Sequence, residues 1–198
     1  MMLLAPRKIS PTHYLFLSLS LLILLIAATG NIGLEFLSLY AVEVNKGEIW
    51  RIVTANLVHF GWIHTAMNLL AFLLCCYAFF SKTSILNFLL LLLICFLFVG
   101  LGIYFFNPYY TPYAGLSGAI HGLIAAGILL TREYPRWLRW CVGILFAGKI
   151  IYENSSYFET TDLQNLIGAQ VAVEAHLYGA IGGIVYAFAA KISSLIKR

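Results

Sequence analysis

The chain has 198 residues, of which 62% are hydrophobic and 10% are charged. A soluble domain usually has about 45–50% apolar and about 25% charged residues, so this composition excludes an ordinary soluble domain and predicts one integral membrane domain over the whole chain, 1–198. The net charge of +4 does not indicate nucleic-acid binding, because the basic residues are scattered around the ends of apolar segments and form no stripe.

Six apolar segments are predicted as membrane-spanning helices, since about 20 mostly apolar residues cross a bilayer. In chain order they are 14–32, 62–80, 85–106, 117–130, 138–152 and 171–190. The first has an apolar core longer than the roughly 7–15 residues of a signal peptide, so we expect it to be retained. The fourth and fifth are short, which favours helices buried against other helices.

The basic residues predict the orientation of these spans. With a cytoplasmic N-terminus, only Glu133 of the eight acidic residues lies on the cytoplasmic side. Nine of the twelve basic residues lie on that side: Arg7, Lys8, Lys82, Arg132, Arg136, Arg139, Lys191, Lys197 and Arg198. This positive-inside pattern predicts an all-α integral membrane protein with both termini in the cytoplasm.

Two connecting segments stand out on the outer side. The segment 33–61 is rich in Leu, Tyr and Trp, and we expect it to pack on the membrane surface. The polar segment 153–170 is predicted to be mobile and to cover a site at that side.

A serine with glycine neighbours begins the fourth span. A lone serine in such a place is usually a helix N-cap. Here Gly115 lets the backbone turn tightly, and Gly118 and Gly122 form a face of small residues. The free N–H groups of a helix N-terminus would also lie beside the serine. The pattern favours Ser117 as a nucleophile, which needs a base because serine is weakly nucleophilic at its free pKa.

A histidine at the outer start of the last span is the predicted base. His176 is followed by Gly179 and Gly183, which repeat the four-residue spacing of small residues. An interfacial histidine bonded to a loop is the simpler alternative, but ionisable residues inside membrane spans are rare and usually functional. The two small-residue faces predict that the fourth and sixth spans pack together, which would bring His176 to Ser117.

Two further polar groups lie at similar depth. His64 and Asn68 are four residues apart on one helix face; they are either interhelical hydrogen-bonding residues or the donors of an oxyanion hole. His121 lies one turn after Ser117, and we expect it to support the His176 ring rather than act as the base.

Other charged residues receive lesser roles. Lys149 and Glu153, four residues apart, predict a structural ion pair, and Glu174 is expected to point away from His176 on the helix. With no aspartate nearby, a Ser–His dyad whose base is oriented by packing is predicted. We expect neither a metal nor an organic cofactor.

Four motifs, in order along the chain, resemble those of the rhomboid intramembrane serine proteases. They are Trp50-Arg51 in the first outer segment, HxxxxHxxxN formed by His59, His64 and Asn68, GxSG from Gly115 to Gly118, and AHxxGxxxG from Ala175 to Gly183. The resemblance implies a six-helix rhomboid-like bundle, with Ser117 as nucleophile and His176 as base.

Where common rhomboids have a tyrosine four residues after the serine, this chain has His121. The strings 115–122, 149–153 and 171–177 resemble the rhombosortase branch of the family. That branch implies a bacterial inner-membrane enzyme whose site opens to the periplasm. Its substrates would be exported proteins with a C-terminal anchor made of a Gly-Gly motif, a transmembrane helix and a basic tail.

Three alternatives stay open. The chain could be a general rhomboid protease with other single-span substrates, or a non-catalytic rhomboid-like protein that binds transmembrane helices. A small transporter that relays protons through His64, His121 and His176 is a third, although no pseudo-symmetric halves support it. Membrane lipid is an expected partner, nucleic acid is not, and an accessory membrane protein is left open.

Overall fold

A computed structural model describes residues 10–196 of the chain. Six longer helices are formed: α1 (Pro11–Ala28), α5 (Trp62–Phe79), α6 (Ile85–Phe106), α7 (Ser117–Leu130), α8 (Arg136–Glu153) and α10 (Glu174–Ile196). Four short ones join them: α2 (Asn31–Leu37), α3 (Ala41–Asn45), α4 (Arg51–Thr54) and α9 (Thr161–Ile167). The prediction of an all-helical fold is confirmed for this part of the chain.

Each predicted span overlaps one of the six longer helices, and the bounds 85–106 and 117–130 are those of α6 and α7. The last span begins later than predicted, because α10 starts at Glu174. Four helices, α1, α5, α6 and α10, are long and apolar enough to cross a membrane, and α7 is a shorter apolar helix. Helix α8 is not among these four; Arg136, Arg139, Lys149 and Glu153 all lie in it.

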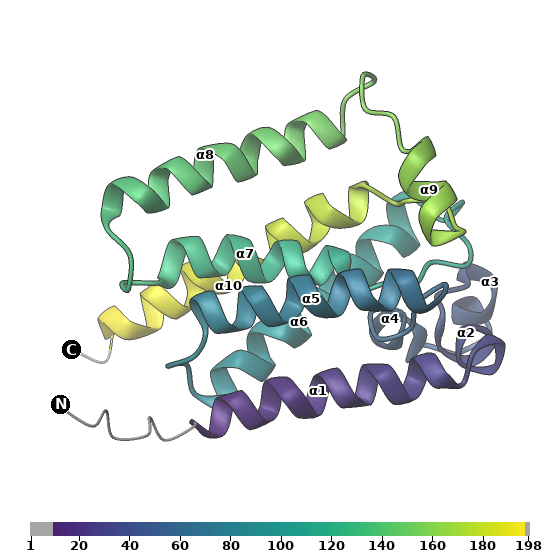
Figure 1. Ribbon diagram of the computed structural model, residues 1–198, viewed down its shortest axis with the longest axis horizontal. Helices are drawn as coiled ribbons and strands as arrows, with labels where there is room; N and C mark the ends of the chain where they lie inside the picture. The colour runs from purple at the N-terminus through teal and green to yellow at the C-terminus, as the bar shows by residue number, and fades with distance from the viewer. Residues whose placement is uncertain (1–9, 197–198) are drawn as a thin grey trace, which may run out of the picture.

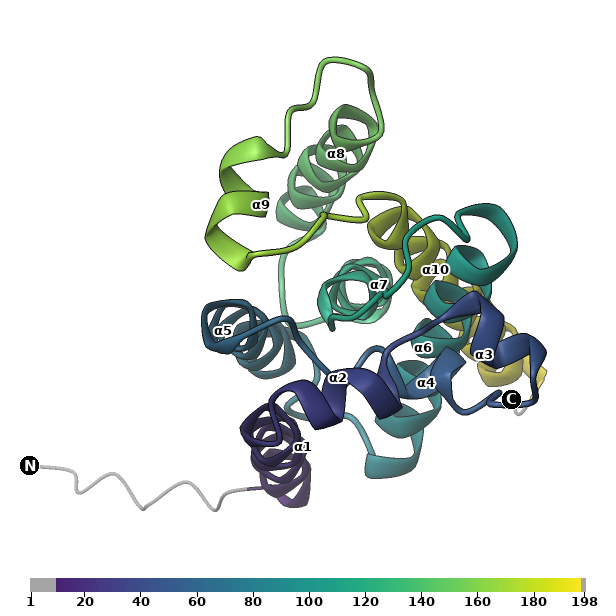
Figure 2. The same ribbon diagram turned by 90° about the vertical axis from the view of Figure 1, so that its right-hand side faces the viewer.

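Helix α7 occupies the middle of the molecule. Seen end-on, it is surrounded by α5, α6, α8 and α10 (Figure 2), and it contacts all four. Nine of its 14 residues are buried. Lipid is as apolar as a leucine side chain, so the association of these helices depends on close packing more than on the hydrophobic effect. A buried central helix places its N-terminal residue, Ser117, between elements that can hold partner side chains.

Helices α7 and α10 touch through their backbones at two successive turns. A Cβ atom added to Gly179 would overlap the carbonyl oxygen of Gly118, and one added to Gly183 would overlap the carbonyl oxygen of Gly122. Conversely, a Cβ on Gly118 would lie 2.8 Å from the carbonyl oxygen of Ala175. The structure thus brings together the two small-residue faces that the sequence predicts.

The segment 33–61 is not an extended loop, because α2, α3 and α4 form within it. Arg51 is buried and ties these helices together. Its Nη1 donates to the carbonyl oxygens of Glu35 at 2.7 Å and Ser38 at 2.8 Å, and its Nη2 lies 2.5 Å from the carboxylate of Glu48. The indole N–H of Trp50 donates to the carbonyl oxygen of Phe36 at 3.3 Å. Trp50 and Arg51 therefore hold the shape of this segment.

The same segment is bonded to the chain that leads into α7. Leu39 and Tyr113 exchange two backbone hydrogen bonds, of 2.9 and 3.0 Å, in an isolated antiparallel bridge. Gly115 N–H donates to the carbonyl oxygen of Ala55 at 2.9 Å. The residues just before Ser117 are thereby fixed by hydrogen bonds to the segment 33–61.

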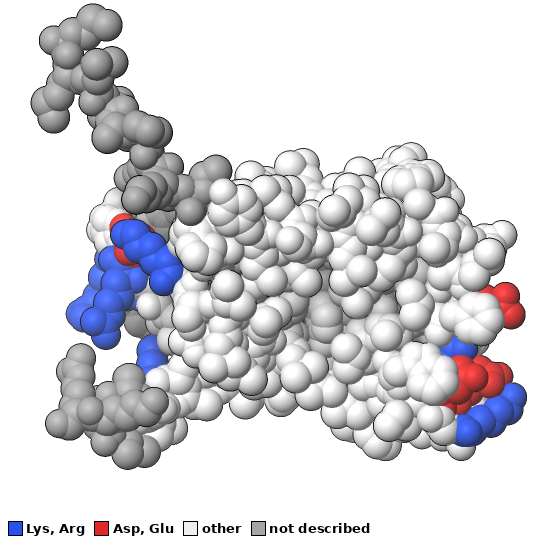
Figure 3. Space-filling view, turned by 90° about the horizontal axis from the view of Figure 1, so that it is seen from below, with Lys and Arg blue, Asp and Glu red and all other residues white. Residues whose placement is uncertain are grey.

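On the face seen in Figure 3, charged side chains gather at the two ends of the bundle and the surface between them is uncharged. Helix α1 begins and α10 ends at the same end (Figure 1). Four basic residues used to predict orientation, Arg7, Lys8, Lys197 and Arg198, lie outside the described residues. The polar segment 153–170 is not irregular throughout, since α9 forms within it.

Candidate active site

The approach of the chain to Ser117 depends on Gly115, which has φ = +135°, a backbone conformation that other residues rarely adopt. A Cβ at this position would also lie 2.9 Å from Cε1 of His64. The next residue, Leu116, is the N-cap of α7, so Ser117 is the first helical residue and not the cap. The hydroxyl of Ser117 is therefore free of the usual capping role.

The side chain of His59 holds this turn by a hydrogen bond to its backbone. Its Nε2 accepts the backbone N–H of Leu116 at 3.3 Å. Burial, together with the neighbouring His64, lowers the pKa of His59 to about 3. A neutral ring at physiological pH leaves a lone pair on Nε2, which this hydrogen bond requires. His59 thus positions Ser117 indirectly, through the backbone of the preceding residue Leu116, a role that the sequence alone did not indicate.

Ser117 and His176 meet where α7 and α10 begin. The Oγ atom of Ser117 lies 3.1 Å from Nε2 of His176, and the histidine is buried. General-base catalysis needs about 2.6–3.2 Å between the two heavy atoms, so the pair is within reach. The backbone contact between Gly118 and Gly179 is what allows this approach.

Glu153 contacts the other nitrogen of the histidine, and the prediction of a base oriented only by packing is wrong. The Oε2 atom of Glu153 lies 3.0 Å from Nδ1 of His176, and both side chains are buried. A carboxylate accepts, so Nδ1 carries the proton and Nε2 keeps its lone pair for the hydroxyl of Ser117. The three side chains lie in the order found in Ser–His–acid triads.

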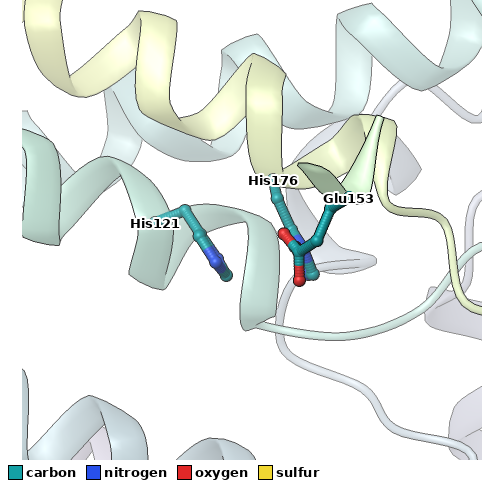
Figure 4. Close-up of side chains that lie close together, drawn as sticks. All are labelled: His121, Glu153 and His176. Atoms are coloured by element: carbon teal, nitrogen blue, oxygen red, sulfur yellow. The ribbon is translucent and has the colours of Figure 1, made fainter. Parts of the chain in front are cut away.

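His121 stacks on the His176 ring, with the centroids 3.9 Å apart and the planes 15° from parallel. Its Nδ1 lies 2.8 Å from the carbonyl oxygen of Ser117, which accepts its proton. Lys149 donates to Nε2 of His121 at 2.9 Å and to Oε1 of Glu153 at 2.5 Å. Helix α7 supplies His121, α8 supplies Lys149 and Glu153, and α10 supplies His176. Figure 4 shows the side chains of His121, Glu153 and His176 close together.

Within residues 10–196, His121, Glu153 and His176 also have the geometry of a possible metal site, since their ligand atoms all lie within 4.8 Å of one another. However, the ammonium group of Lys149 already bonds to two of these three side chains. The cluster therefore holds its own cation, which competes with any metal ion for the same ligand atoms.

His64 and Asn68 are both buried on α5. The ring of His64 lies against Gly115, two residues before the serine. The side-chain amide of Asn68 donates to the carbonyl oxygen of His64 at 3.1 Å. This arrangement brings His64 to the turn that precedes Ser117, while the role of both residues as oxyanion donors stays a prediction.

Comparison with known proteins supplies the family. The Rhomboid domain matches residues 46–192, which is most of the chain. This chain belongs to the rhomboid family. "Rhomboid-like protease 5" of Toxoplasma gondii is 30% identical over 165 residues, which cover 78% of this chain and 18% of that protein.

Two relatives come from Bacillus subtilis. "Putative rhomboid protease YdcA" is 27% identical, and the match covers 75% of this chain and 71% of YdcA. "Rhomboid protease GluP" is 29% identical, and the match covers 89% of this chain and 34% of GluP. The chain thus spans about a fifth of the Toxoplasma relative and a third of GluP. The domain and the names of these relatives support an intramembrane serine protease.

The structure of this rhomboid also shows where other predicted residues lie. The carboxylate of Glu174 bonds to another residue: its Oε1 accepts a 3.4 Å hydrogen bond from the hydroxyl of Tyr109. The predicted pairing of Lys149 with Glu153 is present, but both side chains also bond to histidines of the site. Their sequence spacing indicated the local pair and gave no sign of these partners.

Proposed function

We propose that this rhomboid hydrolyses a peptide bond of membrane-anchored proteins, with Ser117 as the nucleophile and His176 as general base and acid. The observation that carries the proposal is the 3.1 Å approach of Ser117 Oγ to a histidine nitrogen whose lone pair faces it. Nucleophile and base within hydrogen-bond reach, with the base oriented by a third group, are the signature of covalent acyl transfer.

In this mechanism Nε2 of His176 takes the hydroxyl proton as Oγ of Ser117 attacks the carbonyl carbon of the substrate. The carbonyl oxygen becomes an oxyanion, and we assign the backbone N–H of Ser117 with His64 and Asn68 as its donors. One such donor is worth about 2.7–4 kcal/mol of barrier. His176 then protonates the leaving amine. In the second half of the reaction His176 takes a proton from water as the water oxygen attacks the acyl carbon, and it returns that proton to Oγ of Ser117 as the ester bond breaks.

The membrane arrangement that we propose has six spans, with both termini in the cytoplasm and the site opening to the periplasmic side of a bacterial inner membrane. The distribution of Lys and Arg supports this orientation. Helix α7 has 14 residues and spans about 21 Å, whereas the hydrocarbon core of a bilayer is about 30 Å thick. With the C-terminal end of α7 at the inner boundary of that core, Ser117 would then lie below the level of the outer headgroups.

A pair of single-cysteine variants tests the orientation. Gly115 is unsuitable for substitution because of its backbone conformation, so the outer position is Tyr157, which is 83% exposed. In a Cys141→Ala background, which leaves the buried thiols of Cys75, Cys76 and Cys95, we expect Tyr157→Cys to react with a membrane-impermeant maleimide in intact spheroplasts. Lys82→Cys should react only after the membrane is opened. The opposite pattern of labelling would overturn the orientation.

For the substrate, we propose exported proteins that end in a Gly-Gly motif, a transmembrane helix and a basic tail, as in the rhombosortase branch. The presence of His121 in place of the common tyrosine, and the strings that contain Lys149 and Glu153, support this branch. A rhomboid protease with other single-span substrates is the second candidate. The close Ser117–His176 contact disfavours a protein that only binds helices.

Co-expression with two matched reporters tests this choice of substrate. Both reporters end in the same transmembrane helix and basic tail, and only one has the Gly-Gly motif. We expect release of the Gly-Gly reporter alone, with a new C-terminus near the motif that mass spectrometry identifies. Equal release of both reporters would favour a general rhomboid protease. Retention of both, with no labelling of Ser117 by a fluorophosphonate, would contradict the protease function.

A further inference from the structure

The hydrogen bonds around Ser117 form a closed ring through three helices. From the carbonyl oxygen of the serine the ring passes to Nδ1 and Nε2 of His121, to Lys149, to both oxygens of Glu153, to Nδ1 and Nε2 of His176, and back to Oγ of Ser117. We propose that Lys149 and Glu153 are positioning residues of the reaction: they hold His176 in the one tautomer and orientation that can accept the serine proton. This inference rests on the proposed function of Ser117 and His176.

Glu153 is placed to set the tautomer of the base. Only one nitrogen of a neutral imidazole carries a proton, and the carboxylate of Glu153 holds that proton on Nδ1 of His176. When Nε2 takes the proton of Ser117, the ring becomes an imidazolium, and the carboxylate 3.0 Å away then stabilises its charge. Glu153 thus acts through His176 without touching the substrate.

Lys149 in turn fixes Glu153. The carboxylate is only 9% exposed, and a buried carboxylate is costly unless it is paired. Its two oxygens have separate partners: Oε1 accepts from Lys149 at 2.5 Å and Oε2 faces His176. The lysine therefore satisfies the charge of the carboxylate and leaves the other oxygen aimed at the histidine.

The hydrogen bond from Lys149 to His121 explains why His121 is not the base. Its Nδ1 proton is donated to the carbonyl oxygen of Ser117, and its Nε2 lone pair accepts from Lys149. With both nitrogens engaged, the ring has no lone pair for the serine hydroxyl. The His121 ring instead stacks on the His176 ring, with the centroids 3.9 Å apart, and so limits rotation of the His176 ring.

Helix α8 contributes little else to the interior. Apart from Glu153, its only buried residue is Ile150, and the helix packs chiefly on α7. Trp137, Trp140, Ile144 and Leu145 are all exposed on it. Helix α8 thus contacts the site through the two charged side chains and through Phe146, whose ring lies 5.8 Å from that of His121. Only the charged pair can act on the protonation of His176.

Substitution of Glu153 by glutamine gives the sharpest test. Glutamine has one acceptor oxygen where Glu153 serves two donors, so it cannot bond to both Lys149 and His176. We expect Glu153→Gln to lower kcat roughly 10²–10⁴-fold with little change in KM, and to slow fluorophosphonate labelling of Ser117 by a similar factor. Removal of the competing donor, in Glu153→Gln/Lys149→Met, should restore part of the loss, which a merely structural role would not predict.

A second pair of variants covers the case in which Glu153→Gln does not fold. Lys149→Met leaves the carboxylate without its cation, and we expect a loss of at least about tenfold in kcat that Lys149→Arg largely recovers, because arginine keeps the charge and the donors. The control is the Lys82–Glu133 pair, which has an N–O distance of 2.6 Å and lies beyond the opposite end of α7. Lys82→Met and Glu133→Gln should leave kcat unchanged.

The outcomes separate this inference from the proposed function. If wild-type protein is not labelled at Ser117 and cleaves nothing, the proposed function fails and this inference fails with it. If wild type is labelled but folded Glu153→Gln, or failing that folded Lys149→Met, reacts within about twofold of it, the function stands and the positioning role is wrong. Equal loss of kcat in the Lys82 and Glu133 controls would likewise contradict it.

Discussion

Replacement of either Ser117 or His176 by alanine should abolish cleavage. The serine supplies the attacking oxygen, and the histidine removes its proton across 3.1 Å, so neither can act without the other. We expect each single variant, and the double variant, to lose roughly 10⁴-fold or more in kcat. Because the two groups act as one unit, the double variant should be no worse than the more damaging single variant. Single-turnover cleavage of a detergent-solubilised reporter measures all three rates.

The control for this series is the stability of the fold. Both side chains lie at helix ends, and truncation to alanine leaves the glycine contacts of α7 and α10 intact. Thermal unfolding midpoints close to that of wild type are therefore expected. If well-folded Ser117→Ala cleaved at more than a few per cent of the wild-type rate, Ser117 could not be the nucleophile.

The second large effect is expected from Gly179→Ala. The added methyl group would overlap the carbonyl oxygen of Gly118, which is backbone and cannot rotate away, so α7 and α10 must separate. Overpacking of this kind typically costs about 1–3 kcal/mol. Since His176 lies one turn before Gly179, the separation also withdraws the base from Ser117. We expect a lower thermal midpoint and loss of most of kcat, measured by unfolding and cleavage on the same preparation.

Gly148 provides a matched glycine, because a Cβ atom added there would have no neighbour within 4 Å. Alanine is favoured over glycine in a helix by about 0.5–1 kcal/mol, so Gly148→Ala should be neutral or slightly stabilising. A fully active, fully stable Gly179→Ala protein would show that the backbone contact between α7 and α10 is not needed to align the site.

The six longer helices could be predicted because each coincides with an apolar run bounded by turn residues or charges. The sequence also singled out Ser117 and His176, since small residues at four-residue spacing follow both and indicate a shared interface. In the structure, Oγ of Ser117 and Nε2 of His176 lie 3.1 Å apart. The pairing of these helices could be predicted because it depends on residue size, which is read directly from the sequence.

Glu153 could not be identified in this way. It lies 23 residues before His176, on a helix whose large apolar side chains are mostly exposed, so its apolar face does not mark the side that meets the bundle. Its spacing from Lys149 indicated only a local ion pair. The tertiary contact with Nδ1 of His176 depends on the rotation and depth of α8, which only the structure provides. His59 was found as part of a motif, but its role could not be predicted, because it acts on the backbone of Leu116.

The glycine contacts between α7 and α10 restrict which substitutions the protein can accept during evolution. Because the backbones interlock at two successive turns, the helices cannot slide past each other by a fraction of a turn. The distance between nucleophile and base consequently depends on main-chain packing at these glycines, and we expect substitutions on the outward-facing sides of the two helices to leave it unchanged. Changes in substrate preference are therefore expected in loops and outer surfaces that do not contact the site, whereas the chemical step stays tied to α7, α10 and the two charged residues of α8.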